Sequence, residues 1–512
     1  MSPSLSSLAR GAGAGLLLIA ALAQAVVAQP RPAAAGSAPA APAPIAPAKP
    51  GTTATTATGA PIAPAAPVAP RAQPQGPGTP PGPPRGAEVP GLPAVAASQP
   101  QAAVPVSASA RRLYDRSRAQ LLQVRTLFNG SQASVGSGFV VTGEGHVITN
   151  YHVVSQHALE PERYRLQYQT PEGDGGDLEL LDFDARRDLA LLRIVGKTPV
   201  AARMTASPLA FRKADQPLAK GERIYSMGNP HDVAFAVVEG TYNGLVERSF
   251  DPLIYYSGSI NPGMSGGPVL DEDGEIVGIN VSTMIFAQQM SFLVPAQYAN
   301  ALLQRSRQAS PMKGAAWPRL REQLMAYQEE LSRNFLAQPW RTLSHPRYRL
   351  PIPQEQYMRC WGSGSPTDSQ GLQMQRTQCR MEHALFINET LQTGYFGVTE
   401  EVYDGSKLGP IRFANIYTAS FRNERLGGPD KDRTAPYCKE DFVQQPDGPP
   451  LRAVACLRAY RKLDGLVDLT VLVTNVDSST EGALGRFDAR GVSFANATKL
   501  TRHYLQGFAW TR

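Results

Sequence analysis

The sequence predicts a mainly β fold, and two observations on the region after about residue 108 support this prediction. Short apolar runs alternate with turn residues such as Gly, Pro, Asp and Glu, and no long helical pattern separates these runs before residue 296. This texture favours an antiparallel barrel or sandwich over a doubly wound parallel sheet. The runs expected to be strands are 138–141, 146–149, 164–168, 178–182, 189–195, 223–227, 233–239, 245–248, 253–257, 269–270, 275–281 and 290–294.

Residues 1–28 are expected to be a secretory signal peptide. Arg10 gives the segment a positive start, residues 16–28 are apolar apart from Gln24, and small residues at 26 and 28 suit cleavage. An uncleaved anchor is the weaker alternative because the apolar run is shorter than the roughly 20 residues that a spanning helix needs. We therefore expect a periplasmic or secreted protein with no stable membrane span after cleavage.

Residues 29–106 are dominated by Pro, Ala, Gly and Thr. Such a composition has little apolar surface to bury, so the segment is expected to be a disordered linker. Order is expected to begin near residue 107, where a short helix passes into a first strand within 111–127. A helix at 296–307 is expected to close a β domain that extends from residue 107 to 309.

The last two hundred residues are expected to form a helical connector and a separate module. In the connector, residues 310–345, apolar residues recur at the three-to-four spacing of an amphipathic helix over 318–336. Residues 346–512 are expected to be an α+β module of unknown function. Its strands are expected at 385–388, 411–417, 454–461, 467–473 and 492–494, and a helix at 497–506.

All four cysteines lie in this module: Cys360, Cys379, Cys438 and Cys456. An even number of cysteines in an exported chain predicts disulfides, although free buried thiols are an alternative. The pairings Cys360–Cys379 and Cys438–Cys456 are favoured because each closes a loop of about twenty residues, worth about 3 kcal/mol in the chain-entropy model.

Composition argues against two kinds of partner. The formal net charge of +7 is modest for 512 residues, and the basic residues are spread along the chain, so nucleic-acid binding is not expected. No clustered Cys/His spacing is typical of a metal site. We therefore expect neither a metal nor a cofactor.

One stretch, Asn-Pro-Gly-Met-Ser-Gly-Gly-Pro at 261–268, is a candidate nucleophile turn. A serine hydroxyl reacts only if a base takes its proton and amide donors receive the oxyanion. Gly263 would direct its own N–H and that of Ser265 to one point, and Gly266 and Gly267 would let the next strand pass without a Cβ clash. A simple tight turn is the alternative interpretation.

A histidine and an aspartate are the expected partners of this serine. Among seven histidines, His152 follows a predicted strand and has apolar residues on both sides, although a structural histidine is the alternative. Asp188 directly precedes an apolar strand, where its carboxylate could fix the imidazole tautomer. The alternatives are Asp182 or Asp184 as the acid, or Asp188 as a solvated turn residue paired with Arg187.

The strings at 149–154 (Thr-Asn-Tyr-His-Val-Val), 188–192 (Asp-Leu-Ala-Leu-Leu) and 263–268 (Gly-Met-Ser-Gly-Gly-Pro) resemble those of trypsin-like serine proteases of the HtrA/Deg-type bacterial branch. The resemblance covers about residues 113–307 and has the His, Asp, Ser order of the chymotrypsin fold. It implies a chymotrypsin-like double antiparallel β-barrel with the active site between the barrels. A string at 227–230 resembles the family's Gly-Asn-Pro turn, to which we assign a structural role.

The same resemblance implies a role for each residue of a catalytic triad. His152 would act as general base and then acid, Asp188 would orient the imidazole, and Ser265 would form the acyl-enzyme. The amides of Gly263 and Ser265 would form the oxyanion hole.

Two departures from the trypsin pattern bear on activation and specificity. Met264 stands where digestive proteases have an aspartate that pairs with a new amino terminus, so activation by propeptide cleavage is not expected. Ser259 stands where trypsin has a pocket aspartate, so cleavage after small or aliphatic residues is expected. The residues expected to form this pocket are Ser259, Ile279, Asn280, Val281 and Phe292. No convincing copy of the family's PDZ domain follows.

The leading hypothesis is an exported serine endopeptidase that acts on unfolded proteins in envelope quality control, with self-association left open. A catalytically silent peptide-binding or sensor protein built on the protease fold is one alternative. A narrow processing protease with one substrate is another.

Overall fold

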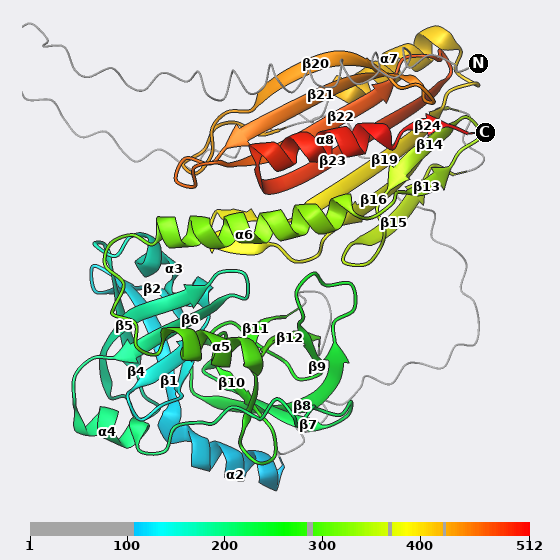
Figure 1. The fold of residues 1–512 in the computed structure, drawn as a ribbon. Coiled ribbons are helices and arrows are strands. Elements are labelled where there is room, and N and C mark those ends of the chain that lie inside the picture. The colour runs from blue at the N-terminus through cyan, green and yellow to red at the C-terminus, as the bar shows by residue number, and fades with distance from the viewer. Residues whose placement is uncertain (1–106, 284–289, 367–370, 423–425, 512) are drawn as a thin grey trace, which may run out of the picture. The chain divides into compact units, whose positions relative to one another are not determined.

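Two closed antiparallel barrels of six strands each follow one another along the chain (Figure 1). The strands pair in the order β1-β2-β3-β6-β5-β4 in the first barrel and β10-β11-β12-β9-β8-β7 in the second. The first barrel consists of β1 (Leu121–Phe128), β2 (Ser131–Val140), β3 (His146–Thr149), β4 (Tyr164–Gln169), β5 (Gly175–Asp184) and β6 (Leu189–Ile194). The second consists of β7 (Arg223–Gly228), β8 (Ala236–Leu245), β9 (Ile254–Tyr256), β10 (Pro268–Leu270), β11 (Ile276–Thr283) and β12 (Ser291–Pro295). The predicted mainly β, chymotrypsin-like double-barrel fold is confirmed.

The structure is a computed structural model that describes residues 107–283, 290–366, 371–422 and 426–511. The expected signal peptide and linker, residues 1–28 and 29–106, therefore lie outside the described residues. All described residues belong to one compact unit. None of the helices in these ranges combines the length and apolar character needed to cross a membrane.

Short helices flank the barrels, and one of them carries a candidate site residue. They are α2 (Ala108–Ser117), α3 (Tyr151–Leu159), α4 (Pro199–Thr205) and α5 (Ala296–Ser306). The sequence indicated α2 and α5 but placed His152 at the end of a strand. In the structure α3 begins two residues after β3 ends, so His152 lies in the first turn of a helix. Its neighbours Tyr151, Val153 and Val154 are buried on the other faces of this turn.

The long helix α6 (Trp317–Leu336) confirms the helix predicted at 318–336. Its buried face is the predicted apolar one, with Leu320, Leu324, Tyr327, Leu331 and Phe335. These side chains join apolar residues of the first barrel and of the module in one continuous buried cluster. The helix is therefore a shared core element rather than an exposed tether.

The carboxyl-terminal module, defined as residues 346–511, is built around a seven-stranded antiparallel sheet in the order β15-β16-β19-β23-β22-β21-β20. A three-stranded sheet, β13-β14-β24, and a hairpin, β17-β18, lie beside it. The first of these strands, β13, belongs to the connector at 310–345, which was expected to be helical. The strands are β13 (Arg341–Ser344), β14 (Tyr348–Ile352), β15 (Arg359–Gly364), β16 (Gln373–Arg380), β17 (Leu385–Asn388), β18 (Leu391–Thr393), β19 (Phe396–Asp404), β20 (Tyr437–Gln444), β21 (Pro450–Ala459), β22 (Leu466–Asn475), β23 (Glu481–Ser493) and β24 (Ala509–Trp510).

Helices cover both faces of the seven-stranded sheet. On one face, α8 (Phe494–Gln506) packs along β22 and β23, as Figure 1 shows. On the other face lies α7 (Pro410–Arg422), where a strand was predicted at 411–417, so that prediction was wrong. Phe413, Tyr417 and Phe421 recur every four residues and pack as one helical stripe against the sheet. Ile411, the first residue of the predicted strand, is 79% exposed.

Both predicted disulfides are present, and each secures an edge of the seven-stranded sheet. Cys360 pairs with Cys379, and Cys438 pairs with Cys456. The first joins edge strand β15 to β16, and the second joins edge strand β20 to β21, in both cases between residues directly opposite in register. An edge strand has hydrogen-bonded neighbours on one side only, so it is held by fewer hydrogen bonds than a central strand. Each disulfide therefore adds a covalent link to a strand that the sheet holds less firmly.

Replacing Cys438 and Cys456 together with serine is expected to lower the free energy of unfolding by about 3 kcal/mol, since the crosslink closes a short loop in the unfolded chain. The sequence separation in that loop is 18 residues, against 19 for the other pair. Urea unfolding of both double variants measures the effect. A free energy of unfolding unchanged by the loss of either crosslink would contradict the expectation.

Candidate active site

His152 and Asp188 form a hydrogen-bonded pair between the start of α3 and the start of β6. Asp188 Oδ2 lies 2.5 Å from His152 Nδ1, and Asp188 Oδ1 accepts from the His152 backbone N–H at 2.8 Å. The Asp188 carbonyl accepts from Asn150 Nδ2 at 2.7 Å, and Asp188 has a φ of 55°, which a non-glycine residue rarely adopts. The carboxylate is thus held in a fixed orientation toward the ring. With Nδ1–H donating to it, Nε2 is the nitrogen left to accept a proton.

The environment of His152 acts on its pKa in two directions. Burial alone would lower the pKa, but the charge of Asp188 and its hydrogen bond raise it, and the pKa of His152 lies above its usual value as a result. The imidazolium that forms when the ring accepts a proton is therefore stabilised by Asp188.

The turn that carries Ser265 lies against the same end of α3. The Ser265 carbonyl accepts from Ser137 N–H at 2.7 Å. A Cβ on Gly266 would lie 2.4 Å from Ser137 O and 2.8 Å from Asn150 N, and one on Gly267 would lie 2.1 Å from Met227 O. Only glycine fits such close backbone approaches, as the sequence predicted for these two positions.

Two backbone amides of this turn donate to no hydrogen-bond acceptor among the described residues. Gly263 has a φ of 94°, and the Pro262 carbonyl accepts from His231 N–H at 2.7 Å, which fixes the orientation of the Pro262–Gly263 peptide. Within the described ranges, no protein atom accepts a hydrogen bond from the N–H of Gly263 or of Ser265. Two backbone N–H groups that are available as donors are what a developing oxyanion requires.

The turn is braced by Ser137, which the sequence did not single out, and by Asn280, which the sequence assigned to the specificity pocket. Ser137 Oγ donates to Gly263 O at 2.7 Å and accepts from Asn229 N–H at 2.9 Å. Asn280 Nδ2 donates to Met227 O and Met264 O, and Asn280 Oδ1 accepts from Ser226 Oγ. Nothing in the spacing of Ser137 indicated this role, because its partners lie more than ninety residues away.

The five residues predicted to form the primary specificity pocket differ from one another in exposure and in what they contact. Ile279 and Asn280 are fully buried, so their side chains support the second barrel and the turn rather than offering surface to a substrate. Ser259 is exposed, and Val281 lines a cavity beside His152. Phe292 is 8% exposed and packs edge-to-face on His383 of the carboxyl-terminal module, with ring centroids 5.6 Å apart.

Two closed six-stranded antiparallel barrels define a chymotrypsin-like fold, and the His-Asp pair and the serine turn come from both barrels. Comparison with known proteins confirms the predicted resemblance to HtrA-type trypsin-like serine proteases. Residues 136–279 match the trypsin-like peptidase domain, a range that includes all three candidate catalytic residues.

Relatives match only part of the chain. Serine protease HTRA3 of Homo sapiens is 33% identical over 172 residues, which are 32% of this chain and 36% of that protein. The "Probable periplasmic serine endoprotease DegP-like" of Ectopseudomonas mendocina (strain ymp) is 34% identical over 177 residues, which are 32% of this chain and 34% of that protein. A solved structure, the serine endoprotease from Yersinia pestis, aligns at 22% identity with a TM-score of 0.33 over 40% of this chain and 67% of that one. The chain thus spans about a third of the length of the curated relatives it matches.

Proposed function

We propose that the protein is a serine endopeptidase that hydrolyses peptide bonds through an acyl-enzyme on Ser265. The observation that carries the proposal is the 2.5 Å contact between His152 Nδ1 and Asp188 Oδ2. This contact is made beside a glycine-rich serine turn with two amides that have no acceptor in the described part of the chain. A peptidase domain match over residues 136–279 supports it.

The proposed reaction has two halves. Ser265 Oγ attacks the substrate carbonyl while His152 Nε2 takes the hydroxyl proton, and the resulting oxyanion accepts hydrogen bonds from the Gly263 and Ser265 amides. His152 then gives the proton to the leaving amine. Water attacks the acyl-enzyme by the same route and releases Ser265. Each oxyanion donor would contribute roughly 3 kcal/mol to lowering the barrier.

The proposed setting is the cell envelope or the exterior. The expected signal peptide and a relative named as a periplasmic endoprotease support export. We propose unfolded proteins as substrates, with small or aliphatic residues before the scissile bond because no charged group replaces the trypsin aspartate at Ser259. Self-association belongs to the same proposal.

Labelling with a fluorophosphonate probe tests the nucleophile directly. The wild-type protein is expected to be labelled and Ser265→Ala is not, whereas Ser207→Ala, a change at an exposed serine of the same region, is expected to be labelled like wild type. Equal labelling of wild type and Ser265→Ala would refute the nucleophile. An unlabelled wild type that still binds peptides would favour the silent binding protein.

A further inference from the structure

A segment of the carboxyl-terminal module, residues 381–387, lies against the active-site end of the first barrel. The Phe386 ring meets the His152 ring edge-on, with centroids 5.9 Å apart. Ile387 O accepts from the hydroxyl of the buried Tyr151 at 3.2 Å. The segment is therefore in contact with the candidate general base itself and with the residue before it.

Between this segment and the barrels is a cavity of about 260 Å³. His152 and Asp188 line one side, and Met381, His383 and Phe386 line the other. The remaining walls include the apolar side chains of Leu253, Val281 and Tyr327 and five charged residues, Arg186, Arg187, Arg248, Asp251 and Glu382. The cavity is smaller than pockets that take drug-sized ligands, which start at roughly 300 Å³. Arg186 and Asp251 of the lining pair with each other and Arg248 pairs with Glu355, so the apolar part of the lining suits one apolar side chain of a peptide.

Ion pairs between three parts of the chain hold the walls in place. Arg186 of the first barrel donates to Asp251 in the loop after β8 at 2.7 Å and to Glu330 of α6 at 2.6 Å. The Arg186 and Asp251 side chains are each only 18% exposed. The Arg186 guanidinium also lies over the rings of Phe250 and Tyr327.

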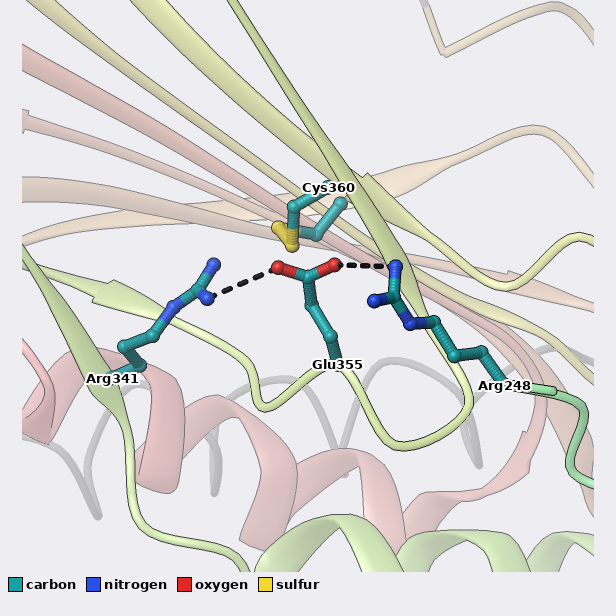
Figure 2. Close-up of a disulfide and its surroundings, with 5 residues drawn as sticks. Arg248, Arg341, Glu355 and Cys360 are labelled. Atoms are coloured by element: carbon teal, nitrogen blue, oxygen red, sulfur yellow. Dashed lines mark hydrogen bonds and ion pairs between the residues drawn. A yellow bond between two sulfur atoms is a disulfide. The ribbon is translucent and has the colours of Figure 1, made fainter.

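A second link attaches the same loop to the module, as Figure 2 shows beside the Cys360 disulfide. Glu355 bridges Arg248 at 3.2 Å and Arg341 at 3.0 Å. The loop from Arg248 to Leu253 is therefore ion-paired both to the first barrel and to the module. These contacts fix the residues that line the cavity.

We propose that residues 381–386 form one wall of the substrate-binding cleft, and that the cavity is a subsite for an apolar substrate side chain preceding the scissile bond. The inference rests on the proposed function. The cavity shares Val281 with the predicted primary pocket, and His383 packs on Phe292 of the same pocket. In this arrangement a residue next to the one whose carbonyl is attacked would contact Phe386, whose ring meets that of His152. Substrate preference would then depend on the module as well as on the barrels.

Peptide-library kinetics on Phe386→Ala test this proposal. Removing the ring is expected to lower kcat/KM about tenfold for peptides with Leu or Phe at the affected position, because a pocket contact discriminates by roughly ten- to two-hundred-fold. Peptides with Gly there are expected to change little. Phe386→Leu keeps the apolar packing and is expected to give a smaller loss. Phe442→Ala, at a 64% exposed position of the module, is the matched control and is expected to keep the wild-type profile.

Three outcomes would overturn the inference. An unchanged profile in fully labelled Phe386→Ala and Phe386→Leu would show that the segment does not contact substrate, while the proposed function would stand. A uniform rise in kcat/KM for all peptides would show that the segment blocks the cleft instead of lining it. Absence of fluorophosphonate labelling in the wild type would overturn both proposals.

Discussion

Replacing His152 with alanine is expected to lower kcat by about 10⁶-fold, the size of the loss seen when the base of a Ser-His-Asp triad is removed. In the proposed reaction His152 Nε2 takes the hydroxyl proton of Ser265, so without this nitrogen the acyl-enzyme is not expected to form at a useful rate. The free amides of Gly263 and Ser265 remain, so a residual rate of about 10³-fold over water is expected. Steady-state turnover of an unfolded protein and fluorophosphonate labelling both measure the loss.

A second histidine on the same helix provides the control. His157 lies on α3 and its Nδ1 is 2.9 Å from Tyr164 O. His157→Ala removes an imidazole from α3 without touching the His152–Asp188 pair, so kcat is expected to stay near wild type. An equal fall in both variants would mean that damage to α3, and not loss of a base, explains the result.

The barrels could be predicted from the sequence because each strand is a short local pattern. The run at 146–149 is β3 residue for residue, and the run at 223–227 falls within β7. Helices α3 and α7 were missed for the same physical reason. Both contain β-branched residues that favour strands locally, Val153 in α3 and Ile411 in α7. Packing of the buried face of each helix overrides that preference: Val153 and Val154 are buried in α3, and Phe413 and Phe421 are buried in α7, whereas Ile411 itself is exposed.

The sequence allowed prediction only of those candidate site residues that stand in a recognisable short motif. His152, Asp188 and Ser265 each stand in a short string of distinctive residues. The bracing by Ser137 could not be read in this way, because it joins segments far apart in the chain. Phe386 gave no signal either, since the sequence assigned it to a separate module and its contact with His152 exists only in the folded chain.

Replacing Asp188 with asparagine is expected to lower kcat by about 10⁴-fold, as it does when the triad acid of a serine protease is changed to its amide. Asparagine nearly preserves the shape of the carboxylate, but it cannot hold the Nδ1–H tautomer or stabilise the imidazolium. In the wild type the pKa of His152 is raised by Asp188 against the lowering effect of burial. Only the neutral ring acts as a base, so kcat/KM is expected to fall as pH drops below this raised pKa.

The same substitution should move the acidic limb of the pH profile. Asp188→Asn removes both effects that raise the pKa of His152 and leaves burial, which lowers it, so the acidic limb is expected to shift to lower pH. Asp184→Asn is the matched control, because Asp184 lies on the same segment but pairs with Arg187 at 3.2 Å. This variant is expected to keep the wild-type limb. The acidic limb of the pH profile reports the pKa of His152, which depends on the carboxylate that faces the imidazole. If Asp184→Asn shifted this limb and Asp188→Asn did not, the orienting acid would be Asp184.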